Sequence, residues 1–137
     1  MYNEEAFQYL LASESKRSER SGYSFNILLI YSTSTDKQGL IVKMDRDMAD
    51  RVVTALARTL RATDYIGWYR EERIVGGVLT VLREDYAVEL SVRIQQRVME
   101  ILRVELSVKE IRRLQIRICQ QHALERAESG EGTFMVT

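Results

Sequence analysis

Apolar residues recur every three or four positions in three segments of the chain, which is the spacing of one helix face. The middle segment has the most regular pattern, with Met44, Met48, Val52, Leu56 and Leu60 following one another at intervals of four. Acidic residues stand near its start and arginines near its end, as the helix dipole favours. The pattern predicts helices over residues 4–20, 44–60 and 85–103.

Four further segments have the character of β-strands. The first is a nearly continuous apolar run, typical of a central strand buried on both faces. The second and third flank the charged residues 70–73, which is the pattern of a hairpin with a polar turn, and Gly76 and Gly77 mark a close backbone approach or a bulge. The last alternates apolar and polar residues like a half-exposed strand. The predicted strands are residues 25–31, 65–69, 74–82 and 114–118.

The resulting order, α-β-α-β-β-α-β, predicts an α/β sandwich in which a mixed β-sheet is flanked by helices. A length of 137 residues suits a single domain, and the chain has no proline that would build a stiff linker. We expect a polar loop over residues 32–39. Residues 128–137 are expected to form a loose tail, unless residues 133–136 add a short edge strand.

The charge and cysteine content exclude several classes of protein. Twenty Lys and Arg balance twenty Asp and Glu, so a protein built around nucleic-acid phosphates is excluded. A single cysteine, Cys119, and a single histidine, His122, cannot form a Cys/His zinc site or a disulfide framework, and no nucleophile-elbow motif accompanies His122. No apolar run reaches the roughly 20 residues of a membrane span, and residues 1–5 lack the basic and apolar segments of a signal peptide. We expect a cytoplasmic protein with no nucleic-acid or membrane partner.

Three strings carry a family resemblance. Residues 14–30 read ESKRSERSGYSFNILLI, residues 49–53 read ADRVV, and residues 61–69 read RATDYIGWY. In order and spacing they are similar to the E-x-x-R-x-x-R-x-G-x-x-F, G-D-x-x-L and R-x-x-D-x-x-x-R-Y motifs of the GGDEF family, the diguanylate cyclase domain. The resemblance covers about residues 4–120 and implies a nucleotide-cyclase-like fold.

The departures from the family pattern fall on its catalytic positions. In active members two carboxylates hold two magnesium ions, which activate the 3′-hydroxyl of one GTP to attack the α-phosphate of another. Tyr31 replaces the first carboxylate, and a phenol with a pKa of about 10 is a poor magnesium ligand. Glu72 keeps the second, but Arg70 and Glu71 replace two glycines and Arg73 replaces an acid. The resemblance implies a degenerate domain that is not an enzyme and holds no metal or cofactor.

One binding motif of the family is retained. Arg61-x-x-Asp64 precedes the signature position by five residues, as in the inhibitory site where the Arg pairs with phosphate and guanine of cyclic di-GMP and the Asp accepts from guanine N–H groups. Arg93 stands near a further arginine of that site, and Asp50 matches one guanine contact of the active site. A helix-terminal arginine followed by a turn aspartate also explains Arg61 and Asp64 without a ligand.

Two functions therefore stay open. The first is a bacterial-type signalling module that binds cyclic di-GMP through Arg61 and Asp64, and the second is a protein-interaction or dimerisation module with no nucleotide ligand. Residual GTP chemistry is a third hypothesis, against which Tyr31 argues. Glu71 and Glu72 are interpreted as a solvated charge cluster, and the basic surplus over residues 103–117 is interpreted as a solvated face.

Overall fold

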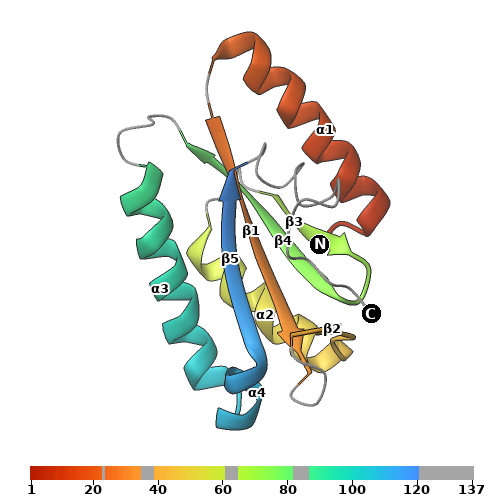
Figure 1. The fold of residues 1–137 in the computed structure, drawn as a ribbon, viewed down its shortest axis with the longest axis vertical. Helices are drawn as coiled ribbons and strands as arrows, with labels where there is room; N and C mark the ends of the chain where they lie inside the picture. The colour runs from red at the N-terminus through yellow and green to blue at the C-terminus, as the bar shows by residue number, and fades with distance from the viewer. Residues whose placement is uncertain (23, 35–38, 61–64, 82–86, 121–137) are drawn as a thin grey trace.

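The fold is an antiparallel sheet with helices on both faces (Figure 1). The computed structural model describes residues 1–22, 24–34, 39–60, 65–81 and 87–120. The elements in chain order are α1 (Glu4–Ser21), β1 (Ser24–Thr33), β2 (Ile41–Val42), α2 (Arg46–Thr59), β3 (Tyr65–Arg70), β4 (Ile74–Val81), α3 (Ala87–Glu105), α4 (Val108–Arg113) and β5 (Leu114–Gln120).

Strand β1 lies at the centre of the sheet. It pairs along most of its length with β4 and with β5, and its last two residues pair with β2, while β3 pairs with β4. Every one of these pairs is antiparallel, so the expected mixed sheet is corrected to an antiparallel one within the described strands. Within the described residues, parallel pairing is confined to an isolated bridge between Tyr2 and Gly67.

The two faces of β1 feed two separate cores, because successive side chains of a strand point to opposite faces. Leu28 and Ile30 pack with residues of α2 and α3, whereas Ile27 and Leu29 pack with residues of α1. The prediction of a central strand buried on both faces is confirmed. The strand is longer than predicted, because Ser32 and Thr33, expected in the polar loop, pair with β2.

Local capping sets the ends of the first two helices. Asn3 accepts a hydrogen bond from the backbone of Ala6 to begin α1, which ends at Gly22 with φ of 71°. Asp45 accepts from the backbone N–H of Met48 at 2.8 Å, so α2 begins at Arg46 and not at Met44 as predicted. Both helices are confirmed, with shifts of a few residues at their ends.

The hairpin of β3 and β4 is confirmed, and the structure decides between the two explanations of its glycines. A Cβ built on Gly76 would lie 2.7 Å from the Phe7 ring, and one built on Gly67 would lie 2.8 Å from it. The glycines thus allow close approach of α1, since real Cβ contacts are not that short. The register irregularity lies instead between Trp68 and Arg70 of β3.

The last part of the described chain holds an element that was not predicted. Helix α4 follows α3 after a short corner, within the segment that was interpreted as a solvated face. Strand β5 confirms the predicted alternation, because Leu114 and Ile116 are buried while Gln115 and Arg117 are exposed. The predicted tail and its possible edge strand lie outside the described residues.

Candidate functional site

A cleft of about 770 Å³ lies between the N-terminal segment, the start of α2 and the β3–β4 turn. Four carboxylates line it, together with two basic side chains and an indole. We call it the hairpin cleft. Its lining residues are Met1, Tyr2, Asn3, Lys43, Met44, Asp45, Arg46, Ala49, Asp50, Trp68, Glu71 and Glu72.

Glu72 is held in the turn by its backbone, and its side chain forms an exposed ion pair. Its φ of 62° is left-handed, and its carbonyl oxygen accepts a hydrogen bond from the backbone N–H of Met44 at 2.7 Å. Its carboxylate lies 3.1 Å from the Lys43 ammonium group. The acid that the family resemblance assigns to metal binding is therefore paired with a neighbouring cation at the protein surface.

Glu71 joins the turn to the start of α1 by a reciprocal pair of hydrogen bonds. Its carboxylate accepts from the backbone N–H of Glu4 at 2.9 Å, and the Glu4 carboxylate accepts from the backbone N–H of Glu71 at 2.6 Å. Glu71 thereby satisfies one of the N–H groups that a helix leaves free in its first turn. Its position in the hairpin cleft is explained by this structural contact.

Arg70 and Arg73, the two arginines of the charged residues 70–73, lie at the ends of the β3–β4 turn. Arg70 ends β3, its guanidinium lies 4.5 Å from the centroid of the Tyr69 ring, and it donates to the Tyr69 carbonyl oxygen at 2.9 Å. The backbone N–H of Arg73 donates to the Arg70 carbonyl oxygen at 3.0 Å and closes the turn. Arg70 does not line the hairpin cleft, whereas Glu71 does.

Tyr31 lies inside the core on the α1 side. It stands opposite Ile74 of β4 and Gln115 of β5, and its side chain is 8% exposed. It does not end β1, as the family pattern suggests, because the strand continues to Thr33. The position expected to carry the first metal carboxylate thus carries a buried phenol in this protein.

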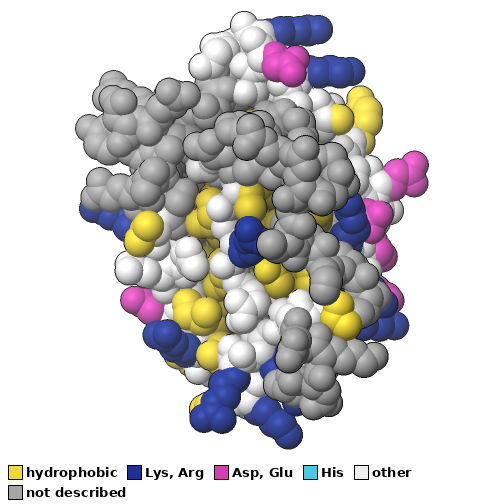
Figure 2. Space-filling model, viewed as in Figure 1, with side chains coloured by type: hydrophobic (Ala, Val, Ile, Leu, Met, Phe, Trp, Pro, Cys, Tyr) yellow, Lys and Arg dark blue, Asp and Glu magenta, His cyan; other side chains and the backbone are white. Residues whose placement is uncertain are grey.

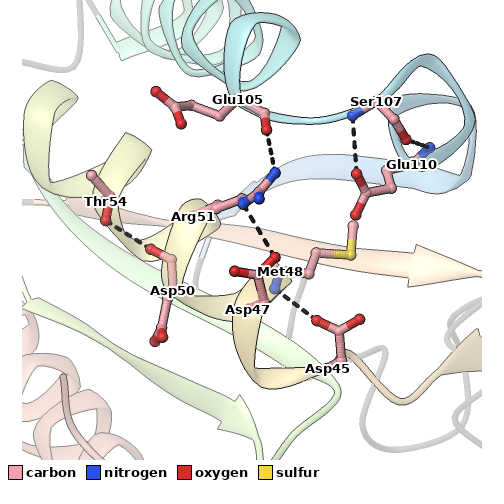
Figure 3. A network of polar contacts seen from close by, with 9 residues as sticks. All are labelled: Asp45, Asp47, Met48, Asp50, Arg51, Thr54, Glu105, Ser107 and Glu110. Carbon is pink, nitrogen blue, oxygen red and sulfur yellow. Dashed lines mark hydrogen bonds and ion pairs between the residues drawn. The ribbon is translucent and has the colours of Figure 1, made fainter.

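The acidic residues at the start of α2 mostly serve the helix itself (Figure 3). Asp45 caps it, Asp47 pairs with Arg51 at 3.2 Å, and Arg51 also donates to the Glu105 carbonyl oxygen at 2.6 Å. Asp50 lines the hairpin cleft and is exposed; its carbonyl oxygen accepts from the Thr54 hydroxyl at 2.8 Å. No group of three or more metal-ligating side chains gathers anywhere in the described residues.

The proposed cyclic di-GMP residues are only partly covered by the structure. Arg61 and Asp64 lie outside the described residues, between α2 and β3. Arg93 is exposed on α3, which packs against α2. Their arrangement as one site stays a prediction from the sequence.

The single cysteine is a half-buried residue of β5. Burial raises the pKa of the Cys119 thiol, and the positive charge of Arg117 opposes that shift. A raised pKa keeps the thiol neutral near pH 7, so Cys119 is a poor nucleophile. His122 lies outside the described residues.

The sequence matches no protein-family model and no curated protein, whereas solved structures do match the fold. A DGC protein from Thermotoga maritima superimposes with a TM-score of 0.61 at 14% identity, over 96% of this chain and 92% of that one. Diguanylate cyclase SiaD from Pseudomonas aeruginosa, in complex with its activator SiaC, gives 0.60 at 20% identity, over 98% of this chain and 57% of that one. The GGDEF domain of TpbB (YfiN) from Pseudomonas aeruginosa gives a TM-score of 0.60 at 14% identity, over 88% of this chain and 72% of that one.

The chain has a GGDEF-like fold. Identities of 14–20% show the fold alone, so the activities of these relatives are not carried over with it. The GGDEF-like chain spans little more than half of the SiaD chain it matches. Within the described residues, none of its helices is both long and apolar enough to cross a membrane.

Proposed function

We propose that this GGDEF-like domain does not cyclise GTP and acts in signalling by binding. The observation that carries the proposal is how the side chains at the candidate metal positions and in the β3–β4 turn are engaged in this structure. Tyr31 is buried in the core, Glu71 is hydrogen-bonded to the start of α1, and Glu72 is paired with Lys43. A two-magnesium mechanism needs several charged oxygen ligands facing one cavity.

The missing first carboxylate weighs more than the ion pair of Glu72. Lys43 and Glu72 are both more than half exposed, and such a surface pair is worth only about 0–1 kcal/mol, so a magnesium ion could displace Lys43. Tyr31 carries no carboxylate and is buried in the core, away from the hairpin cleft that Glu72 lines. Loss of the first metal position therefore supports an inactive domain.

The ligand we propose is cyclic di-GMP, bound by Arg61 and Asp64 with help from Arg93. The spacing of the Arg-x-x-Asp motif from the β3–β4 turn supports this assignment, as does its place directly after α2. An arginine fork suits both a phosphate and the guanine edge, and an aspartate suits guanine N–H donors.

Titration calorimetry with cyclic di-GMP tests this proposal on the full chain. We expect saturable binding that Arg61→Ala weakens by about tenfold to a hundredfold, since a charge-assisted hydrogen bond is worth about 1.5–3 kcal/mol. Arg58→Ala is the matched control, because Arg58, three residues earlier in the sequence, is an exposed arginine of α2 that pairs with Glu105 at 3.9 Å. Equal affinities of wild type and Arg61→Ala, or no binding at all, would refute the proposal that cyclic di-GMP binds through Arg61.

A protein-binding or dimerisation module is the second candidate. The observation that favours it is the SiaD structure, in which a protein containing this fold is in complex with its activator SiaC. Analytical ultracentrifugation of the full chain separates the two candidates. A concentration-dependent dimer without cyclic di-GMP binding would support the second function over the first.

A further inference from the structure

The exposed side of α3 and α4 concentrates positive charge on a chain whose formal net charge is zero. Arg97 and Arg103 of α3 and Lys109 and Arg112 of α4 are all exposed, and none of the four makes an ion pair within the described residues. Dark blue side chains gather accordingly at the lower end of the molecule in Figure 2, where Figure 1 places α4. We call these four residues, with Val104 and Val108, the α3–α4 basic face.

Two of the three acids of this region are occupied by structural contacts. The Glu105 carboxylate lies 3.9 Å from the Arg58 guanidinium, and the Glu110 carboxylate accepts from the backbone N–H of Ser107 at 3.0 Å in the capping box of α4. Glu100 is the exposed acid that remains. Four cations with one nearby free acid leave a surplus of positive charge that no internal contact of the described residues uses.

The α3–α4 basic face also includes two exposed apolar side chains. Val104 is 83% exposed and Val108 is 70% exposed, on either side of the corner between α3 and α4. Their neighbours Leu102 and Leu106 are buried in the core, so the valines are not needed to hold the helices on the sheet. Exposed apolar side chains on an arginine-rich surface are the composition of a protein-binding surface.

We propose that the α3–α4 basic face binds an acidic segment of a partner protein that carries apolar residues between its acids. Three of the four cations are arginines, whose planar fork binds carboxylates bidentately. Nucleic acid would match the charge but leave both valines unused. A membrane surface needs a whole apolar helix face, and the apolar face of α3 is buried through Val98 and Leu102.

A fluorescence-anisotropy titration of the full chain tests this proposal. The probe is a labelled helical peptide of glutamates with a leucine at every fourth position, and its counterpart has glutamine for every glutamate. We expect saturable binding of the acidic peptide alone. Arg97→Glu with Lys109→Glu should weaken it by about tenfold or more, since two positive charges become negative and the net charge of the face changes by four units. These positions tolerate acids, because Arg97 is exposed and Lys109 lies in the first turn of α4.

Three controls separate the proposal from general charge and from the proposed ligand. Lys16→Glu with Arg20→Glu makes the same charge change on exposed residues of α1 and should leave peptide affinity nearly unchanged. Val104→Thr with Val108→Thr keeps the side-chain shape and should weaken binding at high salt as well as at low salt. Cyclic di-GMP affinity should be equal in all these variants, so the two proposals fail independently.

Two results would overturn the proposal. The first is the absence of saturable binding to the acidic peptide, or equal binding by the Arg97→Glu/Lys109→Glu variant. The second is binding to vesicles of phosphatidylcholine and phosphatidylserine, or to a short DNA duplex, that exceeds binding to the peptide, since either would assign the face to a different class of partner.

Discussion

Glu72 combines a retained acidic side chain with an unfavourable backbone. Among the described residues it is the non-glycine residue with positive φ, and such a conformation costs an L-residue about 1–2 kcal/mol. The exposed ion pair with Lys43 returns only about 0–1 kcal/mol. The tight β3–β4 turn and its hydrogen bond to Met44 therefore impose this conformation, and the ion pair does not.

Replacing Glu72 by glycine should therefore stabilise the protein. We expect Glu72→Gly to raise the free energy of unfolding by up to about 1 kcal/mol, because glycine adopts positive φ without strain. Glu71→Gly is the matched control and should lower it, since it removes the hydrogen bond to the Glu4 backbone. Urea denaturation of the three proteins measures both changes. A less stable Glu72→Gly protein would show that the Lys43 pair outweighs the backbone.

Single residues of the candidate site could be predicted only where local pattern decides their role. The sequence indicated that Glu71 and Glu72 belong to a charged turn, and the structure places them there. It gave no sign of Glu4 as the partner of Glu71, because the two residues lie 67 positions apart and only the fold brings them together. Lys43 was missed as the partner of Glu72 for the same reason.

The ring of Phe7 packs helix α1 closely against the sheet. Phe7 is fully buried and occupies the space over Gly67 and Gly76 on neighbouring strands. The periodicity of α1 was readable from the sequence, and so was the importance of the glycine pair in β4. That Gly76 accommodates Phe7 whereas Gly77 faces Leu60 could not be read, because the packing of a helix on a sheet depends on tertiary structure.

A methyl group on Gly76 should separate α1 from the sheet. We expect Gly76→Ala to lower the free energy of unfolding by about 1–3 kcal/mol, since the new Cβ would lie 2.7 Å from the rigid Phe7 ring. Gly77→Ala is the control and should cost less, because its nearest neighbour at 3.0 Å is the flexible end of the Leu60 side chain. Equal losses in urea denaturation would contradict the role given to Phe7.

Two short elements, α4 and β2, were not predicted from the sequence, and the reason is physical. Helix α4 has six residues, none of them buried, so it has no apolar stripe that a periodicity analysis can detect. A local signal was present, since Ser107 and Glu110 have the spacing of a capping box and form one. Strand β2 has two residues and exists only through its pairing with β1.

At the scale of the whole molecule, β1 connects two cores that, among the described residues, share no side chain. Leu28 faces the α2–α3 core, and its neighbour Leu29 faces the α1 core. Both side chains are fully buried. The prediction of one doubly buried strand in a helix-flanked sheet therefore captured the centre of the fold, whereas the antiparallel pairing of the sheet had to come from the structure.

Loss of either leucine should destabilise the described fold as one unit. We expect Leu28→Ala and Leu29→Ala each to lower the free energy of unfolding by about 2–5 kcal/mol. Each variant should still unfold in a single transition, because both cores are built on β1. Circular dichroism and tryptophan fluorescence, which reports Trp68, should give coincident midpoints. Two separate transitions would show that the cores fold independently.

The central claim is that the domain has lost cyclase chemistry, and GTP turnover tests it most directly. The full chain is incubated with GTP and magnesium, and the products are separated by chromatography beside a protein-free control. We predict no cyclic di-GMP above that control, because Tyr31 provides no carboxylate for the first metal position. Cyclic di-GMP that forms in proportion to the protein, and disappears in Glu72→Gln, would contradict the account.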